Sequence, residues 1–427
     1  MAEIAVRTLL PTSRSMLAAR GAQFLLLTVA ATAGLYARSA VAPLQETIRI
    51  ALALSDNQMA LLQGPALALA PVIAAIPIGV IVDRWSRVRL LFICAVSNIV
   101  GTVITALAPN FAVLFLFRGV IGLAHTAISI AAFSLVADLY APAQRGRATM
   151  VVIVAQYAGI AAAFALGGAL VSMSGTGPSG WRWAMFCSAG PLVPVMFLIL
   201  AMHEPPRTGV VIINPSPREA FTEIWRYRTV IAPLLLGLVM TEIADCAALV
   251  WAAPTLSRNF GLSPNRIGAV MSMVMLVSGI VGSIGGGILA DLCQRAGGGR
   301  RTMSVLSGLA LLSVPASLFA IVARVDVASV MLVGLFMILS AIIVMAVTLL
   351  TMVVPSELRG LCVAVSSGAN TFFGVALAPM MVSMLSGVLG GAPTIGKALT
   401  VICAASGFFG TAMFALGRRY FPRPVLQ

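Results

Sequence analysis

Long apolar runs recur along the chain, separated by short clusters of Gly, Pro, Asn and charged residues. A helix needs roughly 20 apolar residues to cross the hydrocarbon core of a bilayer. Uncharged windows of this order lack the alternation of apolar and polar positions that is typical of membrane barrels. They occur at residues 57–82, 90–117, 148–181, 267–290, 302–323 and 360–396. The pattern therefore predicts helices that span a membrane.

Twelve helices result when the apolar runs are divided at turn signals and at charges. The sequences APN at 108–110 and SGTGPSG at 174–180 are short turns of this kind. The fold expected from this pattern is an all-α polytopic membrane protein. Its predicted helices are 21–43, 56–82, 89–108, 110–138, 147–174, 182–202, 230–257, 264–290, 302–323, 327–354, 360–386 and 396–417.

The longest break lies at the midpoint of the chain, and similar motifs recur on either side of it. Asp83 after helix 2 is echoed by Asp291 after helix 8, and Arg145 after helix 4 by Arg359 after helix 10. The break ends in a predicted amphipathic helix, Ser216–Tyr227. We therefore expect two parallel repeats, which place a substrate site between them near the bilayer midplane. The predicted units are an N-terminal six-helix bundle at 1–202, a cytoplasmic linker at 203–229 and a C-terminal six-helix bundle at 230–427.

Composition excludes a soluble protein. Of the 427 residues, 60% are hydrophobic and only 9% are charged, whereas soluble domains carry about 25% charged residues. The six Cys stand singly in apolar runs, without the paired spacing of disulfide frameworks or zinc sites. The sequence AGGGRR at 296–301 lacks the Lys-Ser/Thr of a phosphate loop. We expect no metal, no cofactor, and a basic N-terminal tail rather than a cleavable signal peptide.

The net charge of +14 comes from 26 Arg and one Lys. Such a charge can indicate nucleic-acid binding, but membrane proteins also retain Lys and Arg in their cytoplasmic loops. With both termini cytoplasmic, 19 of the 27 basic residues fall in cytoplasmic segments and six in outer ones. This asymmetry predicts cytoplasmic termini and no nucleic-acid partner.

The sequence GVIVDRWSRVR after helix 2 resembles the loop 2–3 signature of the major facilitator superfamily. Ser86 replaces a glycine of that signature, and Val88 replaces a basic residue that Arg89 can supply. The residues that match it are Gly79, Asp83, Arg84 and Arg87. The resemblance implies two six-helix bundles and transport by alternating access.

Three further stretches are similar to bacterial members of the Spinster family. They are LSDNQMALLQGPALAL entering helix 2, WAAPTLSRNFGLSPNRIG across the turn between helices 7 and 8, and VPSELRG before helix 11. Helix 5 carries GIAAAFALGG, in which Ala163 and Phe164 replace the central Gly-Pro of the motif found in antiporters. Close packing by small residues explains these glycines equally well.

The superfamily pattern implies a gate where the cytoplasmic ends of helices 2, 3 and 11 meet. Asp83 would accept hydrogen bonds from the start of helix 11 and pair with a nearby Arg in one conformation only. A contact of this kind biases the conformational equilibrium. The alternative is that these charges only fix topology. The residues expected at the gate are Gly79, Asp83, Arg84, Arg87, Arg145, Asp291 and Arg359.

Five ionisable residues lie within predicted spans, where each costs at least a few kcal/mol and marks a functional site. Arg38 is in the outer part of helix 1, Arg118 and His125 lie seven apart on helix 4, and Glu242 and Asp245 lie three apart on helix 7. The two halves thus offer opposite charges, which would pair with each other or bind two ends of a substrate. The alternatives are that Arg38 snorkels outward, that His125 is a packing residue and that the acids pair only with Arg118.

The Spinster resemblance carries over only part of the usual set of charges. Members of that family usually have an Asp-Arg pair on helix 1 and an Arg followed seven residues later by a Glu on helix 4. Here Ala37 precedes Arg38, and His125 stands in place of the Glu. Arg38 and Arg118 therefore match the arginines of the Spinster family, whereas the two acids of that family have no counterpart here. The candidates to bind a coupled proton in their place are Glu242, Asp245 and His125.

Other polar residues at the same depth are candidates for substrate contact, although most such residues only hold helices together. They are Tyr36, Gln156, Tyr157, Trp251, Asn370 and Thr371.

From these features we expect a monomeric secondary transporter in a bacterial inner membrane. It would move a small anionic or amphiphilic solute (an organic acid, a drug or a lysolipid-like molecule) and would use protons as the coupling ion. An intramembrane lipid-modifying enzyme and a non-transporting sensor are the alternatives. No nucleophile–base spacing supports the former, and no signalling domain supports the latter.

Overall fold

The computed structural model describes residues 13–174, 179–205, 228–354 and 359–421. Within these ranges the secondary structure is helical and contains no strand. The result confirms the predicted all-α membrane fold. The predicted helix Ser216–Tyr227 lies outside the described residues, as do the side chains of Asp83 and Arg359.

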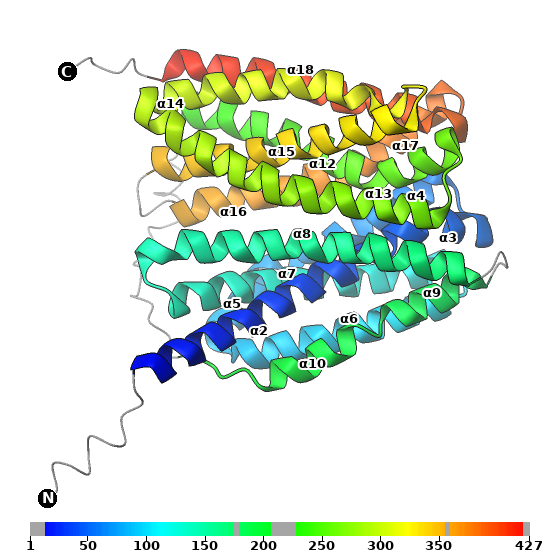
Figure 1. Cartoon of the computed structure of the whole chain (residues 1–427), viewed down its shortest axis with the longest axis horizontal. Helices are drawn as coiled ribbons and strands as arrows, with labels where there is room; N and C mark the ends of the chain where they lie inside the picture. The colour runs from blue at the N-terminus through cyan, green and yellow to red at the C-terminus, as the bar shows by residue number, and fades with distance from the viewer. Residues whose placement is uncertain (1–12, 175–178, 206–227, 355–358, 422–427) are drawn as a thin grey trace, which may run out of the picture.

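The N-terminal half forms the lower part of the molecule in Figure 1. Its long helices lie roughly along one direction, and short helices cluster at the right-hand end of that view. The elements are α2 (Ser13–Ser39), η1 (Ala42–Leu44), α3 (Gln45–Ala51), α4 (Asp56–Gln63), α5 (Pro65–Arg84), α6 (Arg87–Leu107), α7 (Phe111–Leu139), α8 (Pro142–Met173), α9 (Gly180–Ser188) and α10 (Leu192–Leu200).

The C-terminal half forms the upper part, and the described residues begin in α2 and end after α18, both at the left-hand end of the view (Figure 1). Two of its segments, η2 and η4, are π-helical. The elements are α12 (Arg228–Phe260), α13 (Pro264–Val277), η2 (Ser278–Gly282), α14 (Ser283–Ala316), η3 (Ser317–Ala320), α15 (Val325–Val353), α16 (Arg359–Ala369), η4 (Asn370–Leu377), α17 (Ala378–Leu389), η5 (Ala392–Thr394) and α18 (Ile395–Tyr420).

Ten segments of the described residues are long and apolar enough to cross a membrane. One of them, 264–320, covers predicted helix 8 and most of predicted helix 9, which are separated by a bend at Gly298 within α14. Gly298 has φ +63° and ψ −153°, which a residue with a side chain rarely adopts. Helix α5 is a further apolar helix of 20 residues beyond these ten. The count of twelve spans and the cytoplasmic termini stay predictions.

The predicted helix 56–82 is divided at Gly64 into α4 and α5. At Gly64 an added Cβ would lie 2.9 Å from the carbonyl oxygens of Val375 and Ala376. The backbone of η4, from the other half of the chain, therefore approaches this break closely. Pro65 follows as the first residue of α5, where its missing N–H costs nothing.

The two halves meet where α8 packs along α13 and α5 packs against η4. Gly168 and Gly268 face each other at the first crossing. A Cβ at Gly168 would lie 2.6 Å from Pro264 O, and one at Gly268 would lie 3.0 Å from the Cα of Gly168. Gly159 lies against the backbone of Thr32 on α2. The glycines of GIAAAFALGG therefore serve close helix packing, which was one of the two interpretations of that motif.

Arg87 joins three elements of the N-terminal half. Its Nε donates to Glu204 Oε1 at 2.8 Å, and its Nη1 donates to Asp138 of α7. Glu204 Oε2 also accepts from Ser86 Oγ at 2.8 Å and from the Val88 N–H at 3.0 Å, at the start of α6. Partial burial of Glu204 disfavours its ionised form, but these hydrogen bonds outweigh burial and hold its pKa below the usual range. The carboxylate thus ties the segment after α10 to the start of α6.

We expect Glu204→Gln to lower the unfolding free energy of the detergent-purified protein by about 1 kcal/mol at pH 7. A carboxyl whose pKa is depressed by folding stabilises the protein above its unfolded pKa, and that stabilisation is lost as pH falls through the folded pKa. The difference in Tm between wild type and variant should therefore shrink towards zero between pH 6 and pH 3. The control Asp326→Asn removes a carboxylate from an exposed pair with Arg324 at 3.7 Å and should change nothing. A Tm difference independent of pH would contradict this role of Glu204.

Candidate functional site

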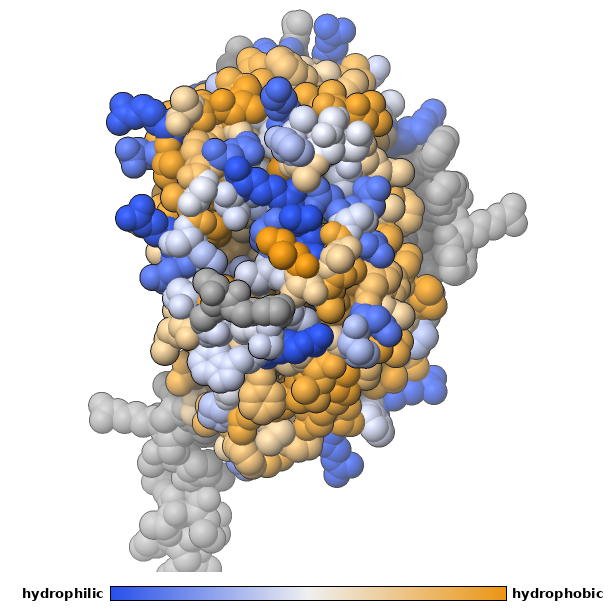
Figure 2. Space-filling view, turned by 90° about the vertical axis from the view of Figure 1, so that its right-hand side faces the viewer, coloured by the Kyte–Doolittle hydropathy of each residue, from blue (hydrophilic) through white to orange (hydrophobic). Residues whose placement is uncertain are grey.

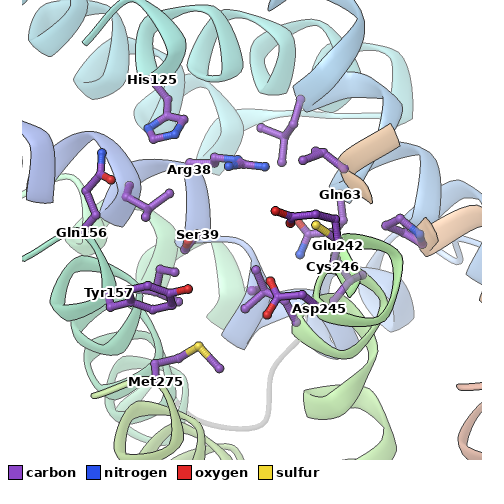
Figure 3. Close-up of a pocket in the computed structure, with 18 of the residues that line it drawn as sticks. Arg38, Ser39, Gln63, His125, Gln156, Tyr157, Glu242, Asp245, Cys246 and Met275 are labelled. Carbon is purple, nitrogen blue, oxygen red and sulfur yellow. The ribbon is translucent and has the colours of Figure 1, made fainter. Parts of the chain in front are cut away.

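A cavity of about 300 Å³ lies between the two halves of the chain. Residues from both halves surround it (Figure 3). Polar and charged side chains face it from α2, α4, α7, α8, α12 and η4, and apolar side chains complete its wall. Its volume is at the lower end of the range for sites that enclose a small organic molecule.

Arg38 extends into this cavity from the end of α2, between His125 on one side and Glu242 on the other (Figure 3). Its guanidinium makes no hydrogen bond or ion pair with any described residue. His125 of α7 also lines the cavity, and its Nδ1 is buried without a partner among the described residues. A cation without a partner therefore faces the cavity, where it is available to an anionic ligand.

Arg118 is buried in the cavity wall, where it connects three elements. Its guanidinium donates to Arg38 O at 2.8 Å, to Leu62 O at 3.4 Å and to Gln63 Oε1 at 2.6 Å. The first two acceptors belong to the last turns of α2 and α4, where carbonyl groups lack helical partners. A cation is favoured at such helix ends. Arg118 thus fixes the backbone from which Arg38 extends.

The C-terminal half supplies the negative groups. Glu242, Asp245 and Cys246 of α12 line the cavity, and their ligand atoms lie within 4.8 Å of one another. Glu242 is hydrogen-bonded to Asn370, the first residue of the π-helical η4. Asp245 Oδ1 is buried and has no partner among the described residues. Such a group of ligands is capable of holding a cation, so the expectation of no metal stays a prediction.

The remaining wall is mostly apolar and aromatic. Tyr157 of α8 lies with its hydroxyl 3.4 Å from Ser340 Oγ of α15, across the boundary between the halves. Gln156 Nε2 lies 3.5 Å from Ser129 Oγ. The apolar residues include Phe164, Phe336 and Met275. This wall suits the carbon skeleton of an organic solute.

Three predicted site residues do not line the cavity. Tyr36 is buried inside the N-terminal half, where its hydroxyl donates to Ser188 O at 3.0 Å. Trp251 is fully buried and its Nε1 donates to Pro379 O at 2.9 Å. Thr371 of η4 donates to Ser367 O of α16 at 2.9 Å. These bonds hold helices in place, and substrate contact by these three residues has no support in the geometry.

The expected gate residues belong to α5, α6, α8, α14 and α16. The observed partners of Arg87 all come from the N-terminal half, and Arg145 Nε donates to Tyr140 O at 3.1 Å. Arg84 and Asp291 are exposed. An Asp83 contact to helix 11 cannot be placed, because the side chains of Asp83 and Arg359 lie outside the described residues. The gate stays a prediction.

Sequence reasoning missed the contact that joins the two halves at the opposite end. Arg258, at the end of α12, donates to both carboxylate oxygens of Asp56 at 2.7 and 2.9 Å and to Glu46 Oε2 at 2.8 and 3.1 Å. Glu46 Oε1 also accepts from Arg49 Nη2 at 2.6 Å. We call Glu46, Arg49, Asp56 and Arg258 the ionic cluster. Hydrophilic residues gather over the middle of this end of the molecule (Figure 2).

Gln63 was also missed, although it fills the wall beside Arg118 and accepts a hydrogen bond from it. Its signal in the sequence was a single amide inside the apolar run LLQGPALAL, directly before the Gly-Pro that divides α4 from α5. For Arg258 the only signal was its place among the few basic residues of the predicted outer segments.

Parts of the sequence match known membrane proteins. A stretch of 117 residues is 30% identical to protein spinster homolog 1 of Rattus norvegicus, covering 27% of this chain and 21% of the relative. A stretch of 137 residues is 26% identical to solute carrier family 22 member 1 of Oryctolagus cuniculus, covering 32% of this chain and 23% of the relative. The chain thus matches about a fifth to a quarter of each relative's length.

Solved structures match over almost the whole chain. A bacterial homolog of the human lysosomal transporter Spinster, crystallised in an inward-facing and unoccupied conformation, aligns with a TM-score of 0.80 and 22% identity, covering 94% of this chain and 97% of that one. A mutant of the nucleoside transporter NupG aligns with a TM-score of 0.69 and 14% identity, covering 92% and 100%. At these identities the likeness shows the fold.

The family follows from the sequence itself. Residues 25–379 match the family model of the Major Facilitator Superfamily, which covers both halves and the cavity between them. The resemblance found in GVIVDRWSRVR is thereby confirmed. The chain belongs to the Major Facilitator Superfamily of membrane transporters.

Proposed function

We propose that the protein is a secondary active transporter that moves a small anionic or amphiphilic organic solute by alternating access, driven by protons, in a bacterial inner membrane. The observation that carries this proposal is a cation, Arg38, that has no partner among the described residues and faces Glu242 and Asp245 across a cavity between the two halves. Membership of a transporter superfamily favours transport over the intramembrane enzyme or the sensor.

Arg38 supports an anionic group on the solute. A buried guanidinium without a partner is costly, and an anion in the cavity would satisfy it with charge-assisted hydrogen bonds. Tyr157, Phe164 and Phe336 offer apolar surface to the rest of the molecule. An organic acid, an anionic drug or the head of a lysolipid-like molecule has this combination.

Glu242, Asp245 and His125 support proton coupling. Two acids with their oxygens this close in a cavity of low polarity repel each other when both are ionised. A proton bound by the pair removes that repulsion. Because the solute would bind in the same cavity, proton binding and solute binding influence each other. His125, on the opposite wall, offers a second proton acceptor (Figure 3).

The ionic cluster supports alternation. Its acids belong to α3 and α4 and its central cation to α12, so the cluster holds only while the two halves are together at that end. The side chains of Glu46, Asp56 and Arg258 are only 12–19% exposed, which makes the loss of one partner costly. The described conformation is thus closed at the end that the topology prediction places outside.

We expect Arg38→Gln to weaken solute binding about 10- to 100-fold, because it removes a charge-assisted hydrogen bond in a dry site. The solute is found by a thermal-shift screen of the purified protein against organic acids, lysophospholipids and anionic drugs at two pH values. The control Arg324→Gln removes an exposed Arg and should bind as wild type does. Binding by Arg38→Gln within twofold of wild type would remove Arg38 from the solute site.

We expect Glu242→Gln and Asp245→Asn to reduce uptake driven by a pH gradient at least about tenfold in proteoliposomes, since the amides cannot exchange a proton. Solute exchange without a gradient should persist in at least one of them. Asp326→Asn serves as the control. If both amide variants keep gradient-driven uptake, neither acid carries the coupling proton.

We expect Arg258→Gln to open the end of the molecule that carries α3 and α4. The readout is Cys246, which lines the cavity, in a variant whose other five Cys are Ser. An impermeant maleimide added from that side should label Cys246 about tenfold faster or more once the ionic cluster is broken. Arg324→Gln, at the same end, is the control. An unchanged labelling rate would show that the ionic cluster does not hold this end closed.

A further inference from the structure

A second recess lies far from the transport cavity, between the bend of α14 and the end of α18. It measures about 330 Å³, and both elements lie at the left-hand end of Figure 1. Three arginines from two helices surround it. Its lining residues are Gly297, Arg300, Arg301, Ser304 and Arg418.

The fold fixes the walls of this recess. Gly298, with φ +63°, turns the chain so that the second arm of α14 begins directly after it. The ring of Phe421 lies against Gly299, where any side chain would overlap it. Met303 lies against Gly417 in the same way. The end of α18 is therefore held against the bend of α14, and the arginines of both helices are brought to one place.

The charges in the recess are not balanced within the part of the chain that the structure describes. No carboxylate of a described residue pairs with Arg300, Arg301 or Arg418. Arg301 Nη1 donates only to Ala296 O at 3.5 Å, and Ser304 Oγ donates to Arg300 O at 3.0 Å. Like charges gathered in one recess repel each other, and an anion that accepts from several of them removes the repulsion.

The position of the recess relative to the membrane indicates which anion it suits. The predicted spans end at 417 and begin again at 302, so the three arginines stand directly beyond apolar helix ends, at the level of lipid headgroups. Leu292, on the preceding arm of α14, is 55% exposed, which leaves apolar surface for an acyl chain on the same helix. Basic recesses between transmembrane helices at this level bind phospholipid headgroups.

We propose that this recess binds the phosphate group of an anionic phospholipid, held by the guanidinium groups of Arg300, Arg301 and Arg418. A phosphate offers several oxygens at once, which matches donors that converge from two helices. The bound lipid would join the α14 bend to the end of α18 and stabilise the C-terminal half. The site is independent of the solute cavity, and its test does not require transport.

The test measures thermal unfolding of the full-length protein in an uncharged detergent while phosphatidylglycerol or phosphatidylcholine is added. Phosphatidylglycerol should raise Tm at much lower concentration than phosphatidylcholine does. The variant Arg300→Gln/Arg301→Gln/Arg418→Gln should need about 100-fold more phosphatidylglycerol for half of the effect, at about fivefold per arginine. Native mass spectrometry should show the same loss of retained lipid.

The control Arg266→Gln/Arg324→Gln/Lys397→Gln removes the same charge from exposed positions at the other end and should respond within twofold of wild type. The proposal is overturned if the control needs as much additional phosphatidylglycerol as the triple variant does. It is also overturned if phosphatidylglycerol raises the Tm of the triple variant at the same concentration as that of wild type. Inorganic phosphate is the third addition to be tested. If it raises Tm at the same concentration as phosphatidylglycerol does, the recess binds a soluble phosphate instead of a lipid. If the triple variant does not fold, the single variants Arg300→Gln and Arg418→Gln are measured in its place. An unchanged dependence of Tm on phosphatidylglycerol in both would overturn the proposal.

Discussion

The cost of placing charge inside a bilayer is the constraint on which the rest of this structure depends. A chain that is only 9% charged still keeps two arginines, a histidine and two acids within its apolar helices. None of them is tolerable against lipid, so all of them lie around one cavity between the two halves. The opposition of Arg38 to Glu242 and Asp245 follows from this, because each half contributes one sign of charge.

The same constraint separates residues that are available to bind solute from residues that hold helices in position. Arg118 donates to helix-end carbonyls and to Gln63, whereas Arg38 faces the cavity without a partner among the described residues. Away from the cavity, buried charges are paired with charges of opposite sign. The ionic cluster around Arg258 joins the two halves at one end, whereas Arg87 and Glu204 act within the N-terminal half alone. The structure therefore has one closed end and an occupiable interior, as one state of an alternating cycle requires.

Sequence patterns predicted the all-α membrane fold and the identity of the buried charges, because each depends on local composition or spacing. The direction of individual side chains was harder to predict. Tyr36 and Arg38 are two residues apart, which turns them to nearly opposite faces of a helix, and only Arg38 reaches the cavity. The break at Gly64 and the pairing of Arg258 with Asp56 depend on contacts between distant halves, and the local sequence does not specify those partners.

Distances across both ends of the molecule test the central claim most directly. Spin labels at Asn57 and Arg266 span the two halves near the ionic cluster, and labels at Arg89 and Arg295 span them at the opposite end; all four side chains are exposed. The account predicts that acidification or added solute lengthens one distance while it shortens the other, as measured by double electron–electron resonance. Distances that stay fixed, or that change together in the same direction, would contradict alternating access around the Arg38 cavity.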